Sequence, residues 1–170
     1  SKAINIYRIA TLYLRYAEAV NRAGKPNLAF AVLKHGMSEN TLMVDTIVPP
    51  SEKYAVIDSV NPVFYSYVDF TEPRFDNNIG IHARGCGNPD LARDYIIPPL
   101  PTTEDSILYV EDKIIAELAL ETAFEGGRFH DLMRIANRRG NTSYLADKVA
   151  EKHTDNKEEI ILKSNLLPGD

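Results

Sequence analysis

The sequence of 170 residues predicts a mainly α-helical protein with one long irregular section in its middle. Three observations predict this class. Apolar residues recur at helical spacing near both ends of the chain, and glycines follow these apolar runs. Most of the ten prolines fall between residues 37 and 101. We therefore expect helices near residues 5–23, 27–35, 110–125 and 128–139.

The first two expected helices form a hairpin. Gly24 to Asn27 are typical of a turn, and Pro26 lies near the start of the second helix, where its missing N–H costs little. The spacing is that of a tetratricopeptide-like unit, whose packing residues are Tyr13, Tyr16, Ala17, Val20, Ala29 and Leu33. A second copy is not evident, so only this hairpin supports a repeat array.

Residues 37–101 combine prolines with short β-branched or aromatic runs, such as TIVPP at 46–50 and VFYSYVDF at 63–70. This combination predicts a long irregular segment between helices, with two short strands. Loops of this length in a compact domain are usually functional or disordered. The many tyrosines and phenylalanines favour an ordered segment.

The segment from Val110 to Arg139 predicts two amphipathic helices that meet at Gly126 and Gly127. Before the joint, glutamates recur every four residues and form an acidic ridge on an otherwise apolar helix that extends to Phe124. The charged residues that line the segment after the joint are Arg128, Asp131, Arg134, Arg138 and Arg139. We expect a half-buried network of Glu and Arg that holds helices together without touching ligand.

This pattern resembles the C-terminal signature of the SusD/RagB family of glycan-binding outer-membrane lipoproteins, E-x-x-x-E-x-x-x-E-G-x-R-x-x-D-L-x-R. It is met by Glu117, Glu121, Glu125, Gly126, Arg128, Asp131, Leu132 and Arg134. The run from Tyr7 to Gly24 also resembles the helix that precedes the C-terminal region of that family. The resemblance covers residues 4–150 and implies a partial SusD-like fold, with tetratricopeptide-like helices and a missing N-terminal part.

The resemblance also implies a function. The protein would be a non-catalytic component of an outer-membrane nutrient uptake complex, which binds a glycan or oligosaccharide beside a SusC-type TonB-dependent transporter. It would be a lipoprotein of the cell outer membrane, with its lipid anchor upstream of residue 1. The alternative is a helical-repeat protein-interaction module, which rests on residues 7–33 alone.

Composition sets the remaining limits. The length fits a single domain over residues 1–170, and 44% hydrophobic with 25% charged residues is ordinary for a globular chain. A net charge of −5 argues against nucleic acid as a partner. The one basic cluster, Arg134 to Gly140, is interpreted as a helix C-terminus. Cys86 is the single cysteine and cannot form an internal disulfide.

Ligand contact is expected in the middle segment. Sugar rings pack on aromatic faces, while polar side chains bind their hydroxyls. Aromatic and cationic residues gather where no helical periodicity accounts for them, and the candidates are Tyr65, Tyr67, Phe70 and Arg84. The alternative is that these side chains only pack within the loop. The chain has no Trp. We therefore expect either that the main binding surface lies in the missing N-terminal part or that the protein binds a ligand other than a long glucan.

Catalytic, metal and cofactor sites are not predicted. His130 and Asp131 are neighbours in a helix and point about 100° apart. The ridge glutamates have the spacing for a glycosidase, but nearby arginines would keep them ionised. His82 and Cys86 lack further zinc ligands at a recognisable spacing, and the glycines around them lack the lysine of a phosphate-binding loop.

Overall fold

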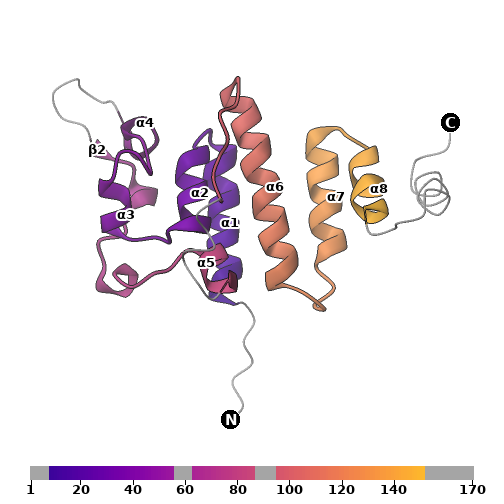
Figure 1. Ribbon diagram of the computed structural model, residues 1–170, viewed down its shortest axis with the longest axis horizontal. Helices are drawn as coiled ribbons and strands as arrows, with labels where there is room; N and C mark the ends of the chain where they lie inside the picture. The colour runs from indigo at the N-terminus through magenta and orange to yellow at the C-terminus, as the bar shows by residue number, and fades with distance from the viewer. Residues whose placement is uncertain (1–7, 56–62, 87–94, 152–170) are drawn as a thin grey trace, which may run out of the picture. The chain divides into compact units, whose positions relative to one another are not determined.

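The computed structural model describes residues 8–55, 63–86 and 95–151. The chain divides into two compact units, residues 1–121 and 122–170, and each unit is described by itself. The described residues are mainly helical, as predicted, and the only strands among them are two residues long (Figure 1).

Helices α1 (Ile9–Arg22) and α2 (Pro26–Lys34) form the predicted hairpin. They pack side by side through buried small and aliphatic residues, among them Leu14, Ala17 and Leu33 (Figure 1). Gly24 takes a φ of +79° in the turn, a conformation that costs glycine little. Every residue from Leu28 to Leu33 is buried, so α2 is the central helix of unit 1.

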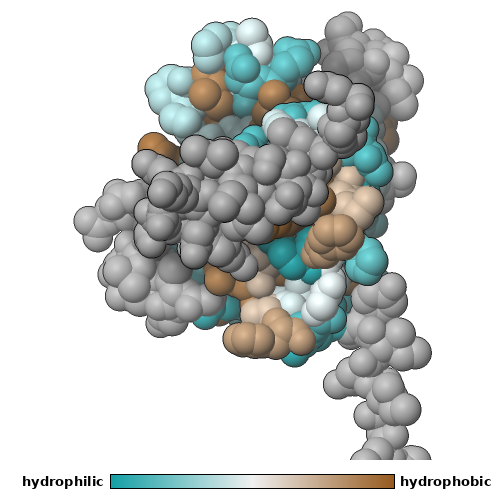
Figure 2. Space-filling model, turned by 90° about the vertical axis from the view of Figure 1, so that its right-hand side faces the viewer, coloured by the Kyte–Doolittle hydropathy of each residue, from teal (hydrophilic) through white to brown (hydrophobic). Residues whose placement is uncertain are grey.

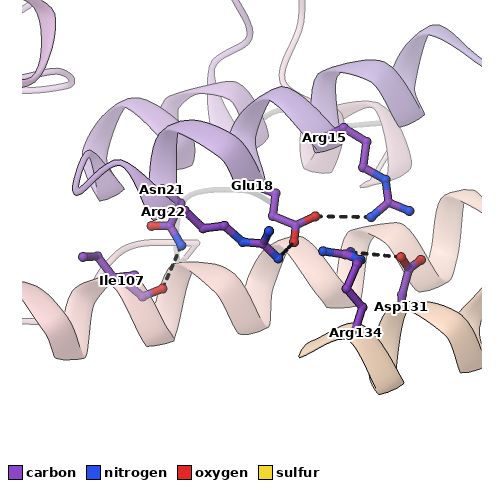
Figure 3. A network of polar contacts seen from close by, with 7 residues as sticks. All are labelled: Arg15, Glu18, Asn21, Arg22, Ile107, Asp131 and Arg134. Carbon is purple, nitrogen blue, oxygen red and sulfur yellow. Dashed lines mark hydrogen bonds and ion pairs between the residues drawn. The ribbon is translucent and has the colours of Figure 1, made fainter. Parts of the chain in front are cut away.

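Helix α6 (Thr103–Glu121) is the third long helix of unit 1 and packs on both α1 and α2. Its core residues are Val110, Ile114, Ile115 and Leu118. The Asn21 side-chain amide donates to the carbonyl of Ile107 at 2.9 Å and ties α1 to α6 (Figure 3). On α1 itself, Glu18 is buried and pairs with both Arg15 and Arg22 (Figure 3).

The predicted range of 110–125 for this helix was wrong at both ends. The helix begins earlier because Thr102 caps it: its hydroxyl accepts from the N–H of Asp105 at 3.1 Å, a signal hidden by a polar first turn. The helix ends at Glu121, and the chain then turns through Phe124, which has a φ of +66° and is fully exposed. Phe124 is therefore not part of an apolar helix face.

The middle segment consists of short elements, as predicted. These are α3 (Glu39–Met43), α4 (Pro50–Lys53), β1 (Tyr54–Ala55), β2 (Val63–Phe64), η1 (Ser66–Val68), η2 (Pro73–Phe75) and α5 (Ile81–Cys86). β1 pairs antiparallel with β2, with Tyr54 opposite Phe64. The run VFYSYVDF thus contains a strand. The run TIVPP does not, because the N–H groups of Ile47 and Val48 donate back to the carbonyl of Val44 in a turn.

Buried polar groups fix this segment to the helices. The Glu52 carboxylate accepts from the backbone N–H of Leu28 and the side-chain amide of Asn27, both at 2.7 Å, and so caps α2. Near the C-terminal end of α2, Gly80 lies against the backbone of Lys34, where a Cβ atom would come within 2.3 Å of the carbonyl. The contact leaves no room for a side chain.

Unit 2 contains α7 (Arg128–Arg139), as predicted, and α8 (Ser143–Ala150), which was not. Gly140 ends α7 with a φ of +61°, and Asn141 accepts from the N–H of Ser143 at 3.0 Å. Buried Ile135 and Tyr144 belong to its core. Among the coloured residues of Figure 2, hydrophobic and hydrophilic side chains are mixed.

Candidate functional site

The segment from Tyr65 to Thr71 forms one wall of a pocket of about 310 Å³ in unit 1, and α3 forms the other. The lining residues are Glu39, Leu42, Met43, Tyr65, Val68, Asp69, Phe70 and Thr71. We call this the aromatic pocket. Two backbone hydrogen bonds fix the first wall. The N–H of Tyr65 donates to the carbonyl of Lys53 at 3.1 Å, and the N–H of Val68 donates to the carbonyl of Tyr65 at 3.0 Å.

Tyr65 and Tyr67 form a stacked pair whose ring centroids lie 5.0 Å apart with an interplanar angle of 10°. The Nζ atom of Lys25 lies 4.0 Å from the centroid of Tyr65 and 5.9 Å from that of Tyr67. An ammonium group near a ring is attracted to its electron-rich face. Buried Lys25 therefore helps to fix both rings at the edge of the pocket.

Phe70 forms the buried floor of the aromatic pocket. It packs edge-to-face with Tyr16 of α1 at 5.6 Å and with Phe75 at 5.3 Å. The Tyr16 hydroxyl donates to the carbonyl of Tyr67 at 2.9 Å. Burial, followed by the neighbouring Tyr67, raises the pKa of Tyr16 above its usual value, and the protonated hydroxyl that donates this hydrogen bond is thereby favoured further. The pocket wall is thereby attached to the helical hairpin.

The polar side chains that line the pocket are two hydroxyls, of Tyr65 and Thr71, and two carboxylates, of Glu39 and Asp69. Asp69 accepts from the Thr71 hydroxyl at 2.7 Å and from the Thr71 N–H at 3.3 Å. These hydrogen bonds, the side-chain one foremost, hold the pKa of Asp69 below its usual value. Glu39 begins α3, which is capped by the Ser38 hydroxyl through the N–H of Thr41 at 3.2 Å. Both acids are exposed, so an acidic rim lies beside an apolar floor.

The predicted ligand residues divide between two places. Tyr65 and Phe70 line the aromatic pocket, and Tyr67 stacks on Tyr65 beside it. Arg84 instead lines a second pocket of about 420 Å³, which also contains Arg8, Glu117 and Glu121. The guanidinium of Arg84 donates there to the carbonyl of Ile79 at 3.0 Å and to the Asn78 side chain at 3.2 Å.

A polar cluster near the second pocket had no signal in the sequence. His82 Nδ1 lies 2.6 Å from Glu117 Oε1, and the Tyr95 hydroxyl donates to the same oxygen at 3.4 Å. The rings of His82 and Tyr95 stack at 3.8 Å, and Tyr95 stacks on Phe30 at 4.9 Å. This cluster joins α5 to α6. It brings together residues that are distant in sequence, which no motif spacing could reveal.

The acidic ridge is only partly as expected. Glu117 is buried against His82, and Glu121 lies 3.6 Å from Arg8 of the same unit. Glu125 lies in the exposed turn after α6, so the three glutamates do not share one helix face. Within α7, Arg134 pairs with buried Asp131 at 3.0 Å (Figure 3).

A metal site does not emerge from residues 8–55, 63–86 and 95–151, because no three His, Cys, Asp or Glu side chains gather there in a geometry that could hold an ion. The Cys86 side chain, which the sequence analysis considered with His82 as a possible zinc ligand, lies outside the described part. None of the helices in the described residues is long and apolar enough to cross a membrane.

These features define a mainly helical protein with an aromatic pocket whose rim is acidic. Comparison with protein-family models, with curated proteins and with solved structures found no match for this chain.

Proposed function

We propose that the chain is the C-terminal portion of a glycan-binding, non-catalytic component of a SusC/SusD-type uptake complex. The observation that carries the proposal is the aromatic pocket. A sugar ring has an apolar face of C–H groups and an edge of hydroxyls, and it needs an aromatic surface beside hydrogen-bond acceptors. Tyr65 and Phe70 supply the first, while Asp69 and Glu39 supply the second.

The size and position of the pocket support this function. A volume of about 310 Å³ is at the small end of the range for ligand sites, which suits one or two sugar units. The wall is held by the Tyr16 hydroxyl and by Lys25 before any ligand arrives. A preformed wall loses little conformational entropy when a ligand binds.

The proposed fold is SusD-like in part. The α1–α2 hairpin, with Gly24 at its turn and Ala17, Val20 and Ala29 buried between its helices, supports a tetratricopeptide-like unit. The Glu and Arg pattern from Glu117 to Arg134 supports the resemblance to the family. In this proposal those residues stabilise helices and leave ligand contact to the aromatic pocket.

A binding screen tests the proposed function. The intact protein is titrated calorimetrically against neutral oligosaccharides of different linkage, and the Tyr65→Ala variant is compared with Phe129→Ala. Phe129 is an exposed aromatic residue of α7, outside the aromatic pocket, so it is the matched control. We expect Tyr65→Ala to lower affinity by roughly tenfold or more and Phe129→Ala to leave it unchanged. Equal losses in both variants would contradict the assignment.

The proposed partner is a SusC-type TonB-dependent transporter in the outer membrane, with the protein attached through a lipid anchor upstream of residue 1. Only the resemblance supports this part of the proposal. Purification of the intact protein from membranes should recover a large β-barrel protein with it. A cytoplasmic location without such a partner would contradict it.

A second function has one observation in its favour. Ile9 and Leu12 of α1 are exposed apolar residues on the proposed tetratricopeptide-like hairpin, which fits a helical-repeat module that binds proteins. The two functions are separable, since Leu12→Ser should weaken protein binding while it leaves the aromatic pocket and any glycan affinity intact.

A further inference from the structure

The aromatic pocket has an unbalanced set of polar groups. Its two charged lining residues, Asp69 and Glu39, are both acids, and the other polar side chains of its lining are the hydroxyls of Thr71 and Tyr65. Ionised carboxylates only accept hydrogen bonds. The Thr71 hydroxyl already donates to Asp69. The charged groups of this rim therefore accept hydrogen bonds only, and they favour a ligand that brings donors.

Two buried lysines beside the pocket do not add a positive charge to its lining. Lys25 lies over the Tyr65 ring, is buried, and does not line the pocket. Lys53 is also buried, with its ammonium donating to the carbonyl of Leu42 at 2.5 Å and to Asp45 at 2.6 Å. Lys53 is thus held by Leu42 and Asp45, and neither lysine is among the residues that line the pocket.

From this geometry we infer that the aromatic pocket selects sugars by charge: it accepts neutral and amine-bearing rings and rejects rings that carry carboxylate or sulfate. This inference rests on the proposed glycan-binding function and specifies its substrate class. Hydroxyl and ammonium groups can donate to Asp69 and Glu39. An anionic group in the same position would meet like charge.

The selection works because a sugar whose ring packs on the aromatic surface places its substituent at the carboxylates of the rim. Packing on Tyr65 depends on the apolar ring face, which neutral, amino and acidic sugars share. Contact with the rim depends on the substituent, in which they differ. Aromatic packing therefore supplies affinity for all three kinds of ring, and the carboxylates discriminate among them.

The test uses two sets of oligosaccharides whose members share ring stereochemistry and linkage and differ in the substituent that carries the charge. The intact protein is titrated calorimetrically with β-1,4-linked tetramers of glucose, glucosamine and glucuronic acid, and with the neutral and acidic β-1,4-mannose tetramers. We expect at least roughly tenfold weaker binding of the acidic member of each bound set. The double variant Asp69→Asn, Glu39→Gln should reduce this preference to about threefold or less, because its rim is uncharged.

A control variant separates a local effect from a change in net charge. Glu72→Gln removes an exposed acid of the same segment that does not line the pocket. It should leave the preference unchanged, and circular dichroism verifies that all variants are folded. Equal or tighter binding of the acidic tetramers by the parent protein would overturn the inference while the glycan-binding function stands. If no tetramer of either set binds, both the inference and the proposed function are contradicted.

Discussion

At Lys53 a positive charge lies almost entirely out of water. The residue is 1% exposed, and its ammonium donates to the carbonyl of Leu42 and to Asp45. Asp45 itself is largely exposed, so water can replace much of its contact. The carbonyl of Leu42 and the buried alkyl stem lack that replacement. The stability that this residue provides should therefore depend on burial more than on the ion pair.

We expect Lys53→Ala to lower the free energy of unfolding by about 3 kcal/mol, because it opens a cavity and removes a buried donor. Asp45→Asn should cost at most about 1 kcal/mol, since it removes only an exposed charge. Urea denaturation of the two variants measures the difference. Similar losses in both would show that the ion pair matters more than the buried stem.

Thr71 controls the ionisation of Asp69 in the rim of the aromatic pocket. Its hydroxyl and N–H both stabilise the carboxylate and hold the pKa of Asp69 below its usual value. The ionised form is therefore favoured by the fold. Its contribution to stability is present above the pKa of the unfolded chain and is lost as the pH falls through the folded value.

Thr71→Val removes the hydroxyl and keeps the N–H, so the pKa of Asp69 should rise toward its usual value. Thr71→Ser retains a donor and should leave the pKa low. An NMR titration that follows the side-chain carboxyl carbon of Asp69 measures this directly. An unchanged pKa in Thr71→Val would mean that the backbone N–H alone stabilises the carboxylate.

At the scale of elements, the long helices were predictable and their joints were not. Apolar spacing and glycines placed α1, α2 and α7 within a few residues of their observed bounds. The start of α6 depends on the Thr102 cap, and its end depends on a left-handed turn at Phe124. A single hydrogen bond and a single dihedral angle thus set the two ends of α6, and the periodicity of apolar residues does not predict either of them.

The close contact of Gly80 with the end of α2 is an element-scale requirement. A Cβ atom at Gly80 would lie 2.3 Å from backbone atoms of Lys34, which cannot move without the helix. We expect Gly80→Ala to lower the free energy of unfolding by about 1–3 kcal/mol. Gly127→Ala is the matched control, because its Cβ would meet only the Thr122 hydroxyl at 3.9 Å. A thermal melt compares the two, and equal melting temperatures would refute the contact.

The candidate site was half predictable for a physical reason. Tyr65, Tyr67 and Phe70 were selected because they gather within one segment, and the structure places them at or beside one pocket. The opposite wall comes from α3, with Leu42 and Met43, and only folding brings it to that segment. The same holds for His82 and Glu117, whose contact joins two helices. Sequence spacing reports neighbours along the chain and not neighbours in space.

At the scale of the whole molecule, the mainly helical fold class was predicted correctly from the composition and the periodicity of the sequence. The two compact units were not anticipated, since the length of the chain fits a single domain equally well. The aromatic pocket lies wholly within unit 1. Glycan binding through this pocket should therefore depend on residues of that unit alone.

The location of the bound sugar tests the central claim most directly. An NMR titration of the intact protein with the tightest-binding neutral oligosaccharide maps the contact residue by residue. If the sugar binds in the aromatic pocket, the largest chemical-shift changes occur at Tyr65, Asp69 and Phe70. Arg8 and Arg84 of the second pocket then change little. Changes centred on Arg8 and Arg84, with Tyr65 and Phe70 unaffected, would contradict it.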